Sequence, residues 1–334
     1  MNYIGSKHKL SSFLKSEIIN TVGSDLSQLI FCDLFAGTGI VGRNFKPLVK
    51  QVIANDIEFY SYVLNRNYIG NSSCLNIDKH LRFLNNLEGT AGFIFQHYCE
   101  NGSENRLYFS AENGKKIDAI RQQIETWKNA DEINEDEYFF LLASLIESAD
   151  KVANTASVYG AYLKQLKKTA QKSLKIVPAT FISTAHSHPV YNENGNELIH
   201  KIKGDILYLD PPYNARQYGA NYHLLTTIAK YDTFIPKGKT GLRDYQRSSY
   251  CKKNEVKNSF EELIKNANFN YIFVSYNNEG LMTEKEVKSI MMKYGKYNLK
   301  TTNYQRFKAD KTTNRNHKAT TTVEYLHILE KNGK

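Results

Sequence analysis

Short apolar runs, each followed by a glycine-rich or acidic turn, recur along the chain. Four of them are predicted to be buried strands, at residues 29–35, 51–56, 205–210 and 271–276. Each contains consecutive apolar residues on both faces of the strand, which is typical of parallel strands whose two faces are both covered by helices. The pattern therefore predicts an α/β fold, in which ligands bind at the carboxyl ends of the strands.

Two capping boxes predict where helices begin. Asn134–Glu137 opens a helix that is expected to reach Asn154, and Thr283–Glu286 opens another. Strand-like stretches follow around 297–304 and 322–329. The chain is therefore expected to end in two strands joined by a basic loop.

The stretch between the second and third predicted strands differs from the rest of the chain. It is largely helical in pattern, and near 159–175 it mixes lysines with tyrosines. A chain of 334 residues is also longer than one average domain. We therefore expect a catalytic domain of residues 1–75 and 190–334, interrupted by an inserted domain of residues 76–189.

The chain is basic, with 44 Lys and Arg residues against 34 Asp and Glu residues and a net charge of +10. This excess favours an acidic polymer as partner. The four cysteines form no C-x-x-C pair, which argues against a zinc site or a disulfide framework. No apolar run is long enough to span a membrane, and the N-terminus has no hydrophobic signal core. A cytoplasmic protein is expected.

A glycine turn, Phe35–Gly39, follows the first predicted strand. Glycine lets the backbone approach a ligand closely and tolerates positive φ. A tight turn without a ligand is also possible, and Gly37, Gly39 and Gly42 match the spacing of a nicotinamide or flavin site. Asp56 ends the next strand, where an acid can accept hydrogen bonds from both ribose hydroxyls of an adenosine-containing cofactor. The alternative role for Asp56 is that of a helix N-cap.

The sequence Asp210–Tyr213, Asp-Pro-Pro-Tyr, ends the third predicted strand and is the most informative motif. Two consecutive prolines make a rigid loop without amide donors, so its carbonyl groups remain available as acceptors. A carboxylate and a carbonyl in one loop can accept both hydrogens of an exocyclic amino group, and the tyrosine offers a face on which a base stacks. The loop is suited to holding an aromatic amine.

Four segments taken in order resemble the D12 class of DNA N6-adenine methyltransferases, which includes the Dam methylases and many type II modification enzymes. They are Asn2–Lys7, Asp33–Gly39, Asn55–Asp56 and Asp210–Tyr213. Their order is that of the alpha group, with the cofactor motif before the catalytic motif. The resemblance spans almost the whole chain but is weak across residues 76–189.

This resemblance implies a Rossmann-like methyltransferase fold with a mixed, mostly parallel sheet and an inserted, largely helical target-recognition domain. It implies S-adenosylmethionine as cofactor, no metal, and double-stranded DNA as substrate, with the target adenine flipped out of the duplex. A monomer is expected. A cognate restriction endonuclease would act on the same short palindrome, such as CATG, without direct contact.

The resemblance also implies a role for each motif residue in cofactor binding. Tyr3 and Lys7 are expected to bind the cofactor, with Lys7 near the methionine carboxylate. Asp33 should lie beneath the cofactor's amino group, and Asp56 should hold the ribose. The backbone and ring that line the methionine and adenosine are expected to come from Phe35, Gly37 and Gly39.

Catalysis is assigned by the same resemblance to the loop Asp210, Pro211, Pro212 and Tyr213. Asp210 is expected to bridge the cofactor and the target amine. The family often has an N-x-D-like motif shortly before the catalytic strand. Residues 192–195 read Asn-Glu-Asn-Gly here, so the corresponding role is unassigned.

Two basic stretches, 164–175 and 306–318, fit either phosphate contacts or solvated faces, the first of them a helix face. The candidates for DNA contacts are Lys164, Lys167, Lys168, Lys172, Arg306, Lys308 and Arg315.

Several other functions share part of this pattern. An RNA methyltransferase acting on a base amine, a cytosine-N4 DNA methyltransferase and an inactive nucleic-acid-binding protein stay open. An NAD-dependent oxidoreductase would explain the glycines and Asp56 but not the Asp-Pro-Pro-Tyr loop. Cytosine-C5 methylation is excluded, because that chemistry uses a cysteine after a proline and no proline here precedes a cysteine.

Overall fold

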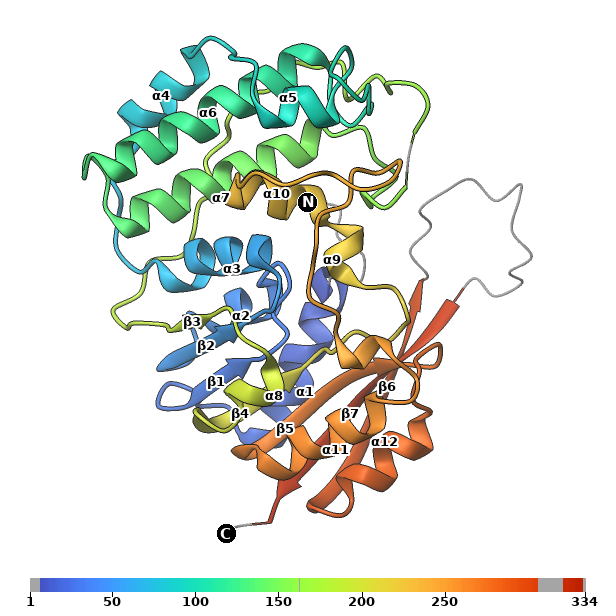
Figure 1. Cartoon of the computed structure of the whole chain (residues 1–334). Coiled ribbons are helices and arrows are strands. Elements are labelled where there is room, and N and C mark those ends of the chain that lie inside the picture. Colours follow the sequence, from blue (N-terminus) through green and yellow to red (C-terminus); the bar gives the residue numbers. More distant parts are fainter. Residues whose placement is uncertain (1–6, 162, 306–320, 333–334) are drawn as a thin grey trace. The chain divides into compact units, whose positions relative to one another are not determined.

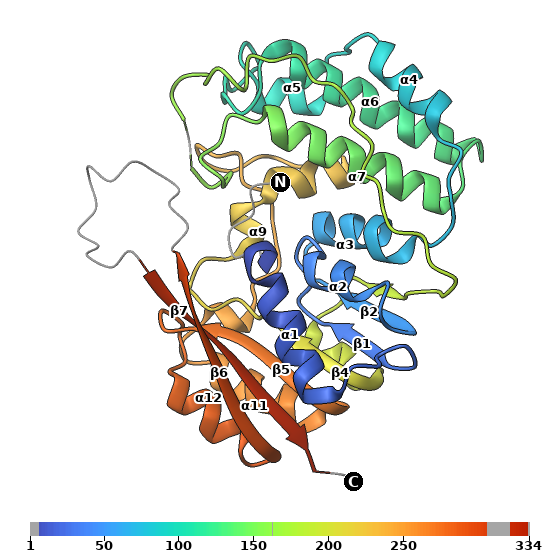
Figure 2. The same cartoon turned by 180° about the vertical axis from the view of Figure 1, so that it is seen from behind.

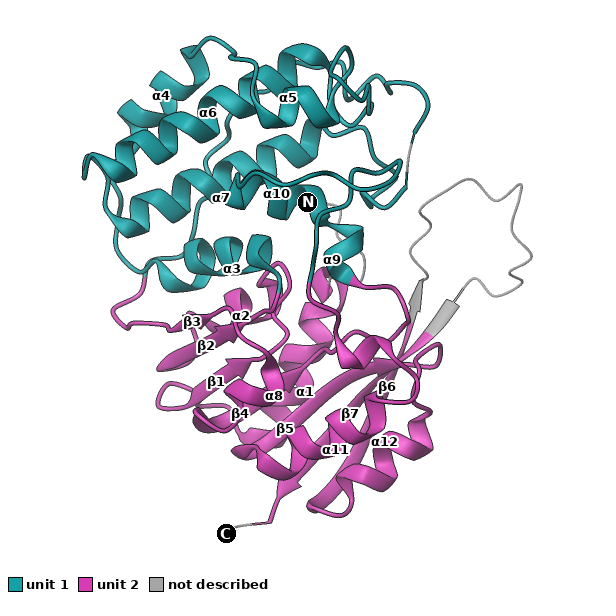
Figure 3. Ribbon diagram, viewed as in Figure 1, with its two compact units in different colours: residues 1–4, 58–183, 218–245 teal, residues 5–57, 184–217, 246–334 magenta. Residues whose placement is uncertain are grey.

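The computed structural model describes residues 7–161, 163–305 and 321–332. The chain divides into two compact units (Figure 3). The helical unit consists of residues 1–4, 58–183 and 218–245. The sheet unit consists of residues 5–57, 184–217 and 246–334.

The sheet unit is built on a seven-stranded sheet in the order β3-β2-β1-β4-β5-β7-β6 (Figure 1). All neighbouring strands are parallel except β7, which runs antiparallel to both β5 and β6. The mixed, mostly parallel sheet that the family resemblance implied is confirmed. The strands are β1 (Ile30–Asp33), β2 (Gln51–Asn55), β3 (Val190–Tyr191), β4 (Lys203–Leu209), β5 (Asn268–Asn277), β6 (Gly295–Gln305) and β7 (Thr321–Lys331).

Helices cover both faces of this sheet, as continuous apolar strands require. Figure 1 shows α11 and α12 in front of the sheet, and Figure 2 shows α1 on the opposite face. The helices of this unit are η1 (Lys7–Leu10), α1 (Ser11–Val22), α2 (Ile40–Phe45), α8 (Gly195–Leu198), η3 (Ser249–Cys251), α11 (Val256–Asn266) and α12 (Glu284–Met291).

Successive strand residues point to opposite faces, and each face has its own core. On one face, Phe31 of β1 stacks on Phe45 of α2 with ring centroids 4.3 Å apart. On the other, Cys32 and Leu207 share an apolar cluster with Phe260 of α11. The capping box at Thr283 is confirmed at the start of α12.

The helical unit has a separate apolar core built from long helices and aromatic side chains. The capping box predicted at Asn134 is confirmed, and it opens a helix that ends at Val152. The helices of this unit are α3 (Phe59–Asn65), the π-helix η2 (Arg66–Gly70), α4 (Asp78–Asn86), α5 (Phe93–Tyr98), α6 (Ala111–Asn129), α7 (Glu135–Val152), α9 (Tyr218–Asn221) and α10 (His223–Lys230).

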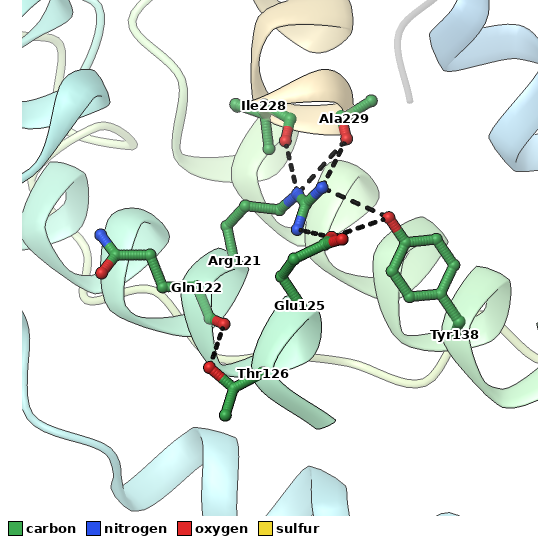
Figure 4. A network of polar contacts seen from close by, with 7 residues as sticks. All are labelled: Arg121, Gln122, Glu125, Thr126, Tyr138, Ile228 and Ala229. Carbon is green, nitrogen blue, oxygen red and sulfur yellow. Dashed lines mark hydrogen bonds and ion pairs between the residues drawn. The ribbon is translucent and has the colours of Figure 1, made fainter. Parts of the chain in front are cut away.

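A buried arginine ties α10 to the rest of the helical unit (Figure 4). The guanidinium of Arg121, on α6, donates to the carbonyl oxygens of Ile228 and Ala229 at the C-terminal end of α10. It also pairs with Glu125 and contacts the hydroxyl of Tyr138 on α7. Because helix C-terminal carbonyls lack partners within the helix, this cation caps α10. Segment 218–245 therefore packs with 58–183 although 34 residues of the sheet unit, 184–217, separate them in sequence.

Candidate active site

Three acids lie at or just beyond the carboxyl ends of adjacent parallel strands. Asp33 ends β1, and it lies opposite Ala54 of β2 on one side and Tyr208 of β4 on the other. Asp56 and Asp210 each lie two residues beyond those partners. The parallel register therefore brings the three predicted site acids to the same edge, where doubly wound folds bind ligands.

The glycine turn between β1 and α2 adopts backbone conformations that favour glycine. Gly37 has φ +53° and Gly39 has φ +75°. The N–H of Gly37 donates to Oδ2 of Asp56 at 2.8 Å, and the N–H of Ala36 donates to the carbonyl of Asn55 at 2.9 Å. The turn is thus fastened to the end of β2, and a side chain at either glycine would be strained.

Asp33 is a buried acid whose two oxygens differ in their hydrogen bonding. It is 1 % exposed, and its Oδ2 accepts the N–H of Gly42 at 3.0 Å. Its Oδ1 is buried and has no hydrogen-bond partner among the residues that the structure describes. Burial raises the pKa of Asp33 to about 7, with Asp210 and Asp56 adding to the rise and the Gly42 bond opposing it. A cationic group beside Oδ1 would supply the missing partner and favour the carboxylate.

Asp56 is not the N-cap of the helix that follows it, because α3 takes Glu58 in that position. Its carboxylate instead accepts from Gly37, and its carbonyl accepts from the side chain of Asn192 at 2.7 Å. The Asn192 amide, whose role the sequence left open, therefore braces the end of β2. Asn194 caps α8 by accepting from the N–H of Asn196.

The side chain of Asn55 joins the segments around the site by hydrogen bonds, a role that the motif did not indicate. Its side-chain amide donates to the carbonyls of Leu34 and Glu193, and its Oδ1 accepts the N–H of Glu193. The ends of β1 and β2 and the loop after β3 are therefore held together by one buried side chain. Phe35 packs edge-on against Tyr250 at 5.0 Å between ring centroids.

The Asp210–Tyr213 loop leaves β4 and is held at its far end. The carbonyl of Tyr213 accepts the N–H of Leu281 at 2.9 Å, and the Tyr213 ring meets Tyr276 of β5 edge-on. Pro211 is buried and Pro212 partly exposed. Since neither proline has an N–H, the loop offers carbonyl acceptors from a fixed backbone.

Lys7 is buried against the Asp210 loop. Its Nζ lies 3.0 Å from Oδ1 of Asp210, 4.0 Å from Oε2 of Glu324 on β7 and 5.9 Å from the centroid of the Tyr213 ring. Burial alone would lower the pKa of Lys7, but the carboxylates of Asp210 and Glu324 hold that pKa above its ordinary value. Burial likewise raises the pKa of Asp210, and the Lys7 ammonium opposes this rise. The structure thus places Lys7 against the Asp210–Tyr213 loop.

Glu324 was missed by the sequence analysis. The available signal was an acid on the same face of a predicted strand as Leu326 and Ile328, and only the pairing of β7 with β5 brings it to Lys7.

The remaining candidates belong to the helical unit or fall outside the described residues. Tyr3, Arg306, Lys308 and Arg315 are outside the described ranges. The lysine-rich stretch 164–175 belongs to the helical unit and forms turns and extended segments, so a helix face there is wrong. The four candidates Lys164, Lys167, Lys168 and Lys172 are exposed, and so is Lys175.

Neither a metal centre nor a membrane span is found in the part of the chain that the structure describes. Within those residues, no group of three or more His, Cys, Asp or Glu side chains could hold a metal ion. No helix among them is both long and apolar enough to cross a bilayer. All four cysteines are free thiols.

Comparison with known proteins matches the chain to one family. The model of the D12 class N6 adenine-specific DNA methyltransferases matches residues 3–290. The type II methyltransferase M.NlaIII of Neisseria lactamica is 64% identical over 99% of each chain. M.CviAII of Paramecium bursaria Chlorella virus 1 is 40% identical over 92% of this chain and 93% of its own. M.FokI of Planomicrobium okeanokoites is 41% identical over 99% of this chain, which spans 53% of that longer protein.

Proposed function

The chain belongs to the D12 class of N6 adenine-specific DNA methyltransferases, and from that premise we propose that it methylates adenine N6 within a short double-stranded DNA sequence, using S-adenosylmethionine. One observation carries the proposal. The Asp-Pro-Pro-Tyr loop lies at the same sheet edge as a buried acid, Asp33, that lacks a partner for one oxygen. The loop could accept hydrogen bonds from the target amine, and Asp33 could accept one from the cofactor's ammonium group.

The residues at this edge fit the cofactor's chemical groups. Oδ1 of Asp33 would accept from the ammonium group, which supplies the missing hydrogen bond. Gly37 and Gly39 would let the adenosine and methionine approach the backbone, with Phe35 beside them. Asp56 would hold the ribose hydroxyls.

The cofactor, when bound, supplies a methyl group already activated by a sulfonium, so the protein needs no covalent nucleophile. Its task is to align the amine and to accept the amine's hydrogens while the nitrogen forms its new bond to carbon. Asp210 and a proline carbonyl in the loop would accept those hydrogens. These bonds strengthen as nitrogen gains positive charge, so they act on the transition state. The proton that N6 loses would leave through Asp210 to water.

The reaction requires that the target adenine be flipped out of the DNA duplex. Adenine N6 is paired inside duplex DNA, so the base must leave the stack, and Tyr213 would stack against it in the pocket. Residues 76–189, most of which belong to the helical unit, would read the surrounding sequence, with Lys164, Lys167, Lys168 and Lys172 as candidates for phosphate contacts.

The biological role follows from the relatives, which are type II methyltransferases. The enzyme would be the modification half of a restriction-modification system, acting as a monomer on cytoplasmic DNA. A partner endonuclease would share the recognition site without touching the methyltransferase.

The deciding experiment follows labelled methyl from S-adenosylmethionine into unmethylated DNA, into a duplex containing CATG and into total RNA. Digestion to nucleosides identifies the product. We expect N6-methyladenine in DNA, and label in RNA or N4-methylcytosine in DNA would overturn the proposal. Failure with the CATG duplex alone would leave the chemistry intact and change only the recognition sequence.

A further inference from the structure

Glu324 is a second buried carboxylate, linked through Lys7 to the proposed catalytic acid, Asp210. Glu324 is 8 % exposed and lies opposite Asn277 across the β5–β7 pair. Its Oε2 is 4.0 Å from the ammonium of Lys7, which is itself 3.0 Å from Asp210. The side chain of Asn277 also hydrogen-bonds Glu324. One buried cation is thus shared between two carboxylates from different strands.

Glu324 occupies a buried position among apolar side chains, which is unfavourable for a carboxylate that has no functional role. Residues two and four positions further along β7, Leu326 and Ile328, point to the same face and are buried apolar side chains. Burying an ionised carboxylate costs several kcal/mol unless it is paired and hydrogen-bonded. An apolar side chain at position 324 would continue the core without this cost. The hydrogen bond with Asn277 and the ion pair with Lys7 offset the free-energy cost of burying the Glu324 carboxylate.

We propose that Glu324 is a positioning residue for methyl transfer, which acts through Lys7 on the catalytic Asp210. Glu324 holds the Lys7 ammonium from the β7 side. The ammonium in turn orients the Asp210 carboxylate and sets its charge. This inference rests on the proposed function, since it assigns a role in that same reaction.

The electrostatic balance of the cluster follows from its two acids and one base. Burial raises the pKa of Glu324, Lys7 lowers it, and the neighbouring Asp210 raises it. By reciprocity, the charge on Glu324 must raise the pKa of Asp210. The other titratable groups near the cluster are Tyr208 on β4, Tyr213 in the loop, Glu279 after β5 and Asp33 on β1. On η1 itself, His8 and Lys9 are exposed.

The test is the dependence of kcat on pH for two charge-removing variants. Asp210 accepts hydrogen bonds as a carboxylate, so activity is lost as the pH falls through the pKa of Asp210. Glu324→Gln removes a negative charge, which lowers that pKa and moves the acidic limb to lower pH. Lys7→Met removes a positive charge, which raises it and moves the limb to higher pH. Opposite shifts are expected, and a merely structural role for Glu324 would not produce them.

The kinetic constants provide a second readout. Glu324→Gln should lower kcat on the order of tenfold, because Asp210 is less well oriented, while the KM for S-adenosylmethionine stays unchanged. In a Lys7→Met background, Glu324→Gln should lower kcat no further, since its effect passes through Lys7. Glu330→Gln, an exposed acid on the same strand, is the matched control and should behave as the unmodified enzyme.

The outcomes separate this inference from the proposed function. If the unmodified enzyme methylates no DNA adenine, both fall. If it does and Glu324→Gln leaves the acidic limb in place or moves it upward, the positioning role alone is overturned. Should Glu324→Gln not fold, Glu324→Asp withdraws the charge by one methylene and must move the limb in the same direction by less. An unmoved limb in that variant is equally decisive against the role.

Discussion

The two units each bury an aspartate, and the two aspartates are satisfied in opposite ways. Asp118, in the helical unit, is fully buried and accepts four hydrogen bonds, from the N–H groups of Gly92, Ile94 and Phe95 and from the hydroxyl of Tyr231. Asp33, in the sheet unit, accepts one hydrogen bond on Oδ2 and, within the described part of the chain, none on Oδ1.

The difference separates an acid whose hydrogen bonds hold the fold together from one that we propose binds the cofactor. Asp118 meets the free N–H groups at the start of α5, so its hydrogen bonds are complete within the chain. Asp33 carries an unmet acceptor, which lowers stability unless a donor arrives. A mutation at the first site should therefore cost stability, and a mutation at the site edge should cost function.

The largest effect is expected at Asp210, the acid proposed to contact the reacting amine. Asp210→Ala should lower kcat by about a thousandfold or more, because the hydrogen bonds that strengthen in the transition state are lost. DNA affinity, measured by fluorescence anisotropy, should change little. Weaker DNA binding with normal turnover of the bound complex would contradict the assignment of Asp210.

The structural side of the comparison is tested at Asp118. Asp118→Asn replaces an acceptor oxygen by an amide donor that faces backbone N–H groups, so the free energy of unfolding should fall by about 3 kcal/mol. Urea denaturation measures this, with Glu88→Gln, an exposed acid in the same unit, as the control. The kcat of the folded fraction should be unchanged. A variant of normal stability and low kcat would remove the distinction between the two acids.

Asp33→Asn tests the unmet acceptor from the ligand side. S-adenosylmethionine affinity should fall about thirtyfold, since a charge-assisted hydrogen bond contributes about 2 kcal/mol. Isothermal titration calorimetry gives the value. Unaltered affinity would show that the ammonium group does not use Asp33.

The same variant has a pH signature in stability. The pKa of Asp33 is raised from 3.8 to about 7 in the folded protein. Between these values the folded state holds the proton more tightly, so this group makes the protein less stable as the pH rises from about 4 to about 7. In thermal unfolding at several pH values, the Tm of Asp33→Asn should rise relative to that of the unmodified protein as the pH increases over that range. A constant difference would place the pKa of Asp33 near its ordinary value.

The smallest effect is expected on the exposed lysines. Lys167→Ala with Lys168→Ala should weaken DNA binding modestly and reduce the slope of log affinity against log salt by about 2. Lys151→Ala, an exposed lysine on α7, serves as the control. Because the Lys167 ammonium also donates to the carbonyl of Thr155, an unchanged slope would assign it to structure instead.

The elements that sequence predicted are those whose signals are local. The apolar runs before Asp33, Asp56 and Asp210 each specify a strand and its end, and the capping boxes at Asn134 and Thr283 specify helix starts by side chains three residues apart. β3 was not predicted, since it has two residues and exists through its pairing with β2.

The parts that sequence did not predict depend on contacts between distant segments. The pairing of Lys7 with Asp210 and Glu324 joins three regions of the chain, and none of the three shows it alone. The grouping of 218–245 with the helical unit rests on single buried residues such as Arg121. The motif residues were recognisable individually, but their distances come from the parallel register of β2, β1 and β4.

The division of the helical unit into two stretches of chain constrains how the unit can be exchanged between relatives. Residues 58–183 and 218–245 flank the segment that carries Asp210, so a single crossover between them would transplant only one of the two stretches. The transplanted stretch would bring Arg121 without the helix end that it caps, or Gly241 without the hydroxyl of Tyr98 that binds its carbonyl. If the helical unit reads the DNA sequence, as proposed, a chimaera with a new DNA preference would need both stretches from one donor. In an evolving lineage, the two stretches would then be inherited together with the Asp210–Tyr213 loop between them.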